Sequence, residues 1–79
     1  MVIFHEDLMS LPWTDEDAMR LKHLRESAGV DAMRFALENA ISLAQLHQLE
    51  NGGDSCFYSQ AIKAHQGHKL MQKLQNLPH

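Results

Sequence analysis

A series of helix start signals constrains the fold of this chain more than any other feature. Thr14 is followed three residues later by Asp17, and Ser42 is followed three residues later by Gln45. In such a capping box the hydroxyl accepts a hydrogen bond from an early helical N–H, while the acid or amide accepts one from the cap residue's own N–H. Asp31 supplies a third N-cap. No segment alternates apolar and polar residues as a half-buried strand does, so we expect an all-α domain.

Stop signals follow these starts and set the lengths of the predicted helices. Gly29 stands where a left-handed residue closes the first helix, Asn39 ends the second, and the turn formers of residues 50–55 end the third. Gly67 interrupts the last stretch, which predicts two short helices, with one bent helix as the alternative. The expectation is five short helices, at about residues 15–28, 32–39, 43–49, 59–66 and 68–75.

Helices this short are unstable in isolation, so each must bury an apolar face against the others. We expect one domain over residues 14–79, preceded by an N-terminal extension over residues 1–13. Trp13, just before the first cap, is expected to cover one end of the core. The predicted core consists of apolar residues at helical spacing: Leu21, Leu24, Val30, Phe35, Ala36, Ile41, Leu46, Leu49, Ile62 and Leu70.

Cysteine content and hydropathy exclude several classes of protein. The chain has one cysteine, Cys56, which excludes an internal disulfide and any multi-cysteine zinc or iron–sulfur site. A free thiol suits a reducing cytoplasm, and Cys56 beside Phe57 is expected to be a half-buried apolar residue. No apolar run approaches the roughly 18–20 residues of a membrane span, and the first residues lack the features of a secretory signal. We therefore expect a cytoplasmic protein without membrane insertion.

Catalysis and cofactor binding are not indicated. The chain has no Ser/His/Asp order, phosphate-binding loop or glycine-rich nucleotide loop, and a domain of 79 residues has little room for a catalytic cleft. His65 and His68 are three residues apart, but Gly67 lies between them and no cysteine or acid nearby completes a metal site. We expect no enzymatic activity, no cofactor and no metal ion.

Charge is distributed unevenly along the chain. The formal net charge is −3, from ten acidic and seven basic residues. Residues 1–17 carry five of the acids and no base, so the rest of the chain is mildly basic. A net-acidic protein is a weak candidate for binding nucleic acid, although a basic surface built from Lys22, Arg34 or the last helices would offset this.

The motifs in the middle of the chain resemble those of a known family. They are Leu24-Arg25-Glu26-Ser27-Ala28-Gly29-Val30, Phe35-Ala36, Ile41-Ser42, Gln45-Leu46 and Gln48-Leu49-Glu50-Asn51-Gly52. In this order and separation, over about residues 18–75, they resemble the phage repressor/Cro-type (XRE) helix-turn-helix family. The resemblance implies a lambda-repressor-like, DNA-binding domain of a bacterial or phage-type transcription regulator. In such domains the second helix of the motif lies in the major groove.

The resemblance also assigns roles to particular residues. It implies a structural ion pair between Arg25 and Glu50, which would fix the third helix to the first. With double-stranded DNA as the partner, contacts are implied for the third helix and its ends: Ser42, Leu43, Ala44, Gln45, His47, Gln48 and Asn51. Among these, the Gln48 amide suits adenine N6 and N7, whereas Leu43 and Ala44 suit thymine methyl groups.

This chain departs from the family pattern at three places. Ala32 stands where a glutamine commonly contacts phosphate, Ala40 where the turn commonly has glycine, and Leu43-Ala44 where the third helix is commonly polar. The Ala40 difference matters little if the turn avoids positive φ. The other two differences, and the lack of lysine or arginine in the third helix, remove hydrogen bonds and positive charge from the surface expected to contact DNA.

An apolar Leu43–Ala44 surface also suits a protein partner. Some membrane-anchored cell-shape proteins carry this fold at a cytoplasmic end and use it to hold a cytoskeletal partner. A helix-turn-helix adaptor that binds protein without DNA is therefore the alternative function. Specific operators usually contain two half-sites, so a DNA-binding form is expected to be a homodimer, with Val2, Ile3 and Phe4 as candidate contact residues, or part of a longer chain that associates elsewhere.

Overall fold

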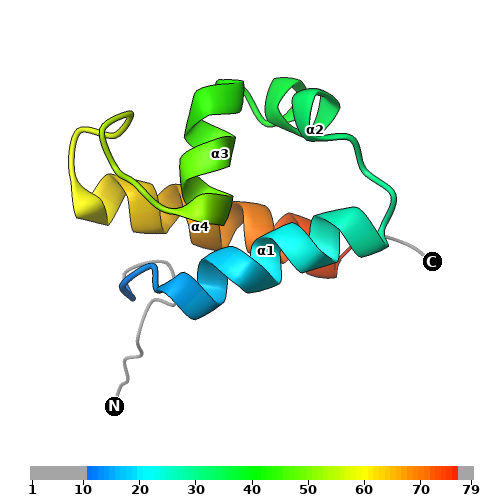
Figure 1. Ribbon diagram of the computed structural model, residues 1–79, viewed down its shortest axis with the longest axis horizontal. Helices are drawn as coiled ribbons and strands as arrows, with labels where there is room; N and C mark the ends of the chain where they lie inside the picture. Colours follow the sequence, from blue (N-terminus) through cyan, green and yellow to red (C-terminus); the bar gives the residue numbers. More distant parts are fainter. Residues whose placement is uncertain (1–10, 77–79) are drawn as a thin grey trace, which may run out of the picture.

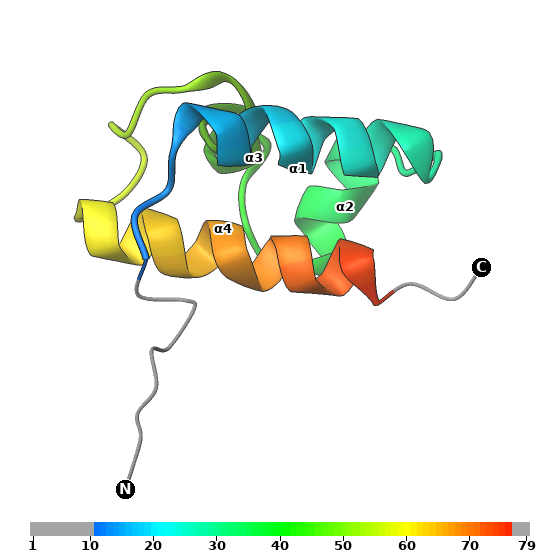
Figure 2. The ribbon, with the colours of Figure 1, turned by 90° about the horizontal axis from the view of Figure 1, so that it is seen from below.

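The computed structural model describes residues 11–76, and helices joined by turns make up this part of the chain. The helices are α1 (Asp15–Ser27), α2 (Ala32–Glu38), α3 (Leu43–Asn51) and α4 (Gln60–Gln75). α1 and α4 run side by side, α3 packs across α1, and α2 lies beside α3 (Figure 1, Figure 2). The all-α expectation is confirmed for the described residues. The candidate dimer contacts Val2, Ile3 and Phe4 lie outside them.

The described residues form four helices, where the sequence predicted five, because Gly67 does not divide α4. This helix runs unbroken over 16 residues. A glycine inside a helix costs about 1 kcal/mol relative to alanine. Gly67, however, is buried against the Trp13 ring, where a side chain has no room. Packing against a distant part of the chain therefore outweighs the local preference at this position.

The predicted caps begin three of the four helices. The Thr14 hydroxyl accepts from the Asp17 N–H at 3.1 Å, and the Asp17 carboxylate accepts from the Thr14 N–H at 3.0 Å. Ser42 and Gln45 form the same reciprocal pair, at 3.0 Å in each direction. The Asp31 carboxylate accepts from the third residue of α2. These bonds satisfy N–H groups that have no partner inside the helix, so the helix starts follow from local sequence.

The core is close to the predicted one, with one clear error. Six predicted residues are buried, and Leu24, Val30 and Ile41 pack against them partly exposed. Ile62 was predicted to be buried and is instead 51% exposed. The inward face of α4 is set by another helical row, and Ile62 lies off it. The buried residues of that row are Ala64, Gly67, Leu70, Met71 and Leu74.

Trp13 fastens the segment before α1 to both α3 and α4. Its indole N–H donates to the carbonyl of Leu49 in α3 at 2.9 Å. The ring lies on Gly67 of α4 and meets the His68 ring edge to face, with centroids 5.1 Å apart. The His68 imidazole in turn contacts the Leu11 carbonyl at 3.1 Å. Trp13 therefore links the C-terminal half of α3 to α4.

The substitution Gly67→Ala is expected to lower the free energy of unfolding by about 1–3 kcal/mol, as overpacking does. An ideal Cβ at this position would lie 2.6 Å from the Trp13 ring. Helix propensity alone predicts the opposite sign, a gain of about 1 kcal/mol. Urea unfolding followed by circular dichroism measures the change. In a Trp13→Ala background the same substitution should be neutral or stabilising, and an undiminished loss there would contradict the contact.

Candidate functional site

α3 has one face in the core and the opposite face toward solvent. Leu46 and Leu49 are fully buried, and Glu50 is buried beside them. Leu43, at the first position of the helix, is 45% exposed. The other exposed side chains of α3 are Ala44, His47 and Asn51. The first turn of the helix is therefore accessible to a partner, and so is an exposed stripe formed by Ala44, His47 and Asn51.

The turn before α3 contains a backbone conformation that L-residues rarely adopt. Ala40 has φ +57°. Its N–H donates to the Leu37 carbonyl at 3.2 Å, and the Ile41 N–H donates to the Ala36 carbonyl at 3.0 Å, which is a Schellman closure of α2. Glycine commonly occupies the left-handed position of this motif because it has no Cβ. Alanine in place of the family's glycine at position 40 therefore strains the backbone of this turn.

A buried ion pair joins α1 to the last turn of α3. The Arg25 Nε and Nη2 atoms donate to the two Glu50 carboxylate oxygens at 2.7 Å and 3.0 Å. The two side chains are only 10% and 4% exposed. Arg25 Nη1 also donates to the Val30 carbonyl at 2.9 Å, in the loop before α2. One guanidinium thus connects α1, the α1–α2 loop and α3, and the structure brings together the pair that the resemblance implied.

The charge on Arg25 is stabilised by this arrangement. The hydrogen bonds to the Glu50 carboxylate raise the pKa of Arg25 above its ordinary value, against the opposing effect of burial. The guanidinium is therefore charged throughout the physiological range. A bidentate pair fixes orientation as well as distance, so Glu50, together with the buried Leu46 and Leu49, sets the rotation of α3 about its own axis.

Gln45 and Gln48 point toward the loop that follows α3. The Gln48 oxygen accepts from the Cys56 N–H at 2.9 Å, and its NH₂ group donates to the Ser55 hydroxyl at 2.8 Å. The Gln45 NH₂ group donates to the Cys56 carbonyl at 3.2 Å, while its oxygen completes the cap at Ser42. The two amides therefore hold residues 55–56 against α3.

A shallow groove of about 310 Å³ lies between α1, α2 and α3. Leu43, His47 and Asn51 line it from α3, and Lys22 lines it from α1. The Lys22 ammonium donates to the Asn51 side-chain oxygen at 3.4 Å, and the Asn51 NH₂ group donates to the His47 carbonyl at 3.1 Å. A positive charge thus stands at the C-terminal end of the exposed stripe.

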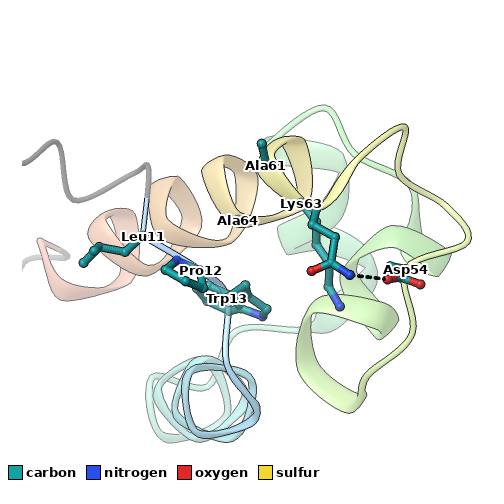
Figure 3. A pocket seen from close by; sticks show the side chains of 8 residues that line it. Leu11, Pro12, Trp13, Asp54, Ala61, Lys63 and Ala64 are labelled. Carbon is teal, nitrogen blue, oxygen red and sulfur yellow. Dashed lines mark hydrogen bonds between the residues drawn. The ribbon is translucent and has the colours of Figure 1, made fainter.

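A second positive charge stands on the other side of this end of α3. The Lys63 ammonium, from the first turns of α4, donates to the Gly53 carbonyl at 2.6 Å. It also lines an open hollow of about 460 Å³. Leu11, Pro12 and Trp13 border this hollow on one side and Asp54 on the other (Figure 3). Arg34, by contrast, pairs with Glu38 of its own helix at 3.1 Å.

Of the seven predicted contact residues, Ser42 caps α3 and Ala44 is exposed in its first turn. The other five form two groups. Leu43, His47 and Asn51 lie together at the groove, whereas Gln45 and Gln48 are turned toward the loop. The link between these amides and residues 55–56 was not predicted, because a contact between a side chain and a loop backbone leaves no spacing pattern in the sequence. The prediction of a half-buried Cys56 is wrong, because this residue is exposed. Its backbone is held by the two glutamines while its side chain faces solvent.

Within residues 11–76, no group of three or more His, Cys, Asp and Glu side chains could hold a metal ion. In the same part of the chain, no helix combines the length and apolarity needed to cross a membrane.

Comparison with protein-family models, with curated proteins and with solved structures gave no match. The residues of the site itself are therefore the basis for assigning a function.

Glu50→Ala is expected to lower the free energy of unfolding by roughly 3 kcal/mol, because it leaves the Arg25 guanidinium buried without its carboxylate. Urea unfolding measures the loss. The matched control is Glu38→Ala, which breaks the exposed pair with Arg34 and should cost about 0.5 kcal/mol or less. Similar losses for the two variants would show that the buried pair does not hold α3.

Ala40→Gly is expected to stabilise the protein by about 1 kcal/mol, because glycine adopts positive φ without the steric cost of a Cβ. The measurement is the unfolding midpoint in urea at an unchanged slope. Ala61→Gly serves as the control, since Ala61 is an exposed position of α4 where glycine should lower stability. A loss at both positions would mean that Ala40 is not strained.

Proposed function

We propose that the protein is a DNA-binding transcription-regulator domain in which α2 and α3 form a helix-turn-helix and α3 enters the major groove. The observation that carries the proposal is the position of α3. It is fixed to α1 by the Arg25–Glu50 pair and exposes Leu43, Ala44 and His47. A helix presented in this way fits a major groove about 12 Å wide.

The charges beside α3 support this proposal. Lys22 on α1 and Lys63 on α4 both reach the C-terminal end of α3 and the loop after it. When a helix lies in the major groove, side chains beside it reach the phosphates along the groove edges. Two lysines give a small number of phosphate contacts, so the affinity of one copy is expected to be modest. Binding of two half-sites by a homodimer would raise it.

A protein-binding adaptor is the second candidate, and one observation favours it. α2 and α3 expose large apolar side chains: Met33 at 57%, Leu37 at 74% and Leu43 at 45%. Met33 and Leu37 are four residues apart and share one face of α2. Apolar side chains gathered on neighbouring helices are typical of protein contact surfaces. The same helix pair would then hold a cytoskeletal or membrane-associated protein without DNA.

A salt titration tests the DNA-binding proposal. Binding of the protein to a mixed-sequence duplex is expected at about 50 mM salt and should weaken as salt rises, with a shallow log–log slope set by few phosphate contacts. Lys22→Ala should reduce the magnitude of that slope by about 0.9, the value for one phosphate contact. Fluorescence anisotropy of a labelled duplex measures both quantities.

The control for this titration is Lys69→Ala, which removes an exposed lysine of α4 that takes no part in the contacts around α3. It should leave the slope unchanged. An equal change for Lys22 and Lys69 would indicate non-specific attraction rather than an α3 interface. Absence of duplex binding at about 50 mM salt would reject the regulator function for this domain and favour the adaptor.

A further inference from the structure

α3 has three amide side chains, and in each of them both the oxygen and the NH₂ group form hydrogen bonds within the protein. Gln45 accepts from Ser42 and donates to Cys56. Gln48 accepts from Cys56 and donates to Ser55. Asn51 accepts from Lys22 and donates to the His47 carbonyl. A bidentate reading of adenine needs both the donor and the acceptor of one amide, so each would have to abandon two contacts before reading a base.

The side chains left for a partner on the outer side of α3 are mainly apolar. Leu43 is 45% exposed, and Ala44 directly after it is exposed as well. Both belong to the first turn of α3, the part of a recognition helix that comes nearest to base edges. His47 follows one turn later with an exposed imidazole ring.

We propose that α3 recognises its site by apolar contact with thymine methyl groups through Leu43 and Ala44, and that Gln48 is a positioning residue that holds the loop at Cys56. This inference rests on the proposed DNA-binding function and names the chemistry that its surface reads. Thymine carries a methyl group in the major groove, where the other three bases carry none. An exposed leucine and alanine that form no hydrogen bonds can discriminate this group from the polar base edges.

The experiment begins with a random-sequence duplex pool enriched on the 79-residue protein at about 50 mM salt. Each thymine of the enriched site is then replaced by deoxyuridine, which keeps the base pairing and removes only the methyl group. At one or two positions, affinity should fall about fourfold for each methyl group removed from the interface. In the Leu43→Ala variant the difference between thymine and deoxyuridine should shrink or disappear at the position that Leu43 touches.

Met19→Ala is the matched control, because Met19 is an apolar residue of α1 that is 69% exposed. This variant should keep the full difference between thymine and deoxyuridine. If deoxyuridine has no effect at any position, and Gln48→Ala instead abolishes a preference for adenine, α3 reads bases through an amide and the inference is wrong. If the pool yields no enriched duplex, the proposed function itself fails, an outcome distinguishable from the previous one.

The role of Gln48 has its own readout. Gln48→Ala should speed hydrogen exchange at the Cys56 N–H, which loses its acceptor, and should leave the base preference of the enriched site unchanged. Gln48→Glu keeps an oxygen for that N–H, so it should restore slow exchange. A changed base preference in Gln48→Ala, at normal Cys56 exchange, would make Gln48 a direct base contact.

Discussion

The buried Arg25–Glu50 pair is the interaction on which the presentation of α3 depends. A carboxylate in the last turn of a surface helix would ordinarily face water, because burial of an unpaired charge is expensive. Here Glu50 faces the core, 4% exposed, because Arg25 meets it with two parallel hydrogen bonds. Once Glu50 points inward, the periodicity of the helix directs Leu46, one turn earlier, inward with it and Ala44 outward. Leu43 and His47 lie at the edge of the buried face, where they line the groove with Glu50. The ion pair and the burial of Leu46 and Leu49 together decide which side of α3 is exposed.

A second contact holds α3 from another direction. Trp13 donates to the carbonyl of Leu49, the residue before Glu50, and rests on Gly67 of α4. The C-terminal half of α3 is thus held by α1 through a charge pair and by α4 through an aromatic ring. Its N-terminal end depends on the Ser42 cap and on a turn in which Ala40 is strained.

Fewer side chains of α3 are available to a partner than its sequence suggests. Gln45 and Gln48, which look like hydrogen-bonding contact residues in the sequence, hold the loop at Ser55 and Cys56. What faces outward is an apolar first turn at one end of α3, with the positive charges of Lys22 and Lys63 at the other end. This combination suits a DNA surface read through methyl groups, and it also explains why an apolar protein partner is the competing interpretation.

The helix starts, the all-α class and most of the core follow from the amino-acid sequence alone. Caps such as Thr14 with Asp17 act over three residues, and burial follows the spacing of apolar side chains, so both are local properties. The pairing of Arg25 with Glu50 came from a family resemblance and not from spacing. Tertiary packing is responsible for three other features: α4 continues through Gly67, Ile62 is exposed, and Gln48 turns to the loop. Each of these depends on contacts between residues distant in sequence or on the rotation of a packed helix, which local preferences do not encode.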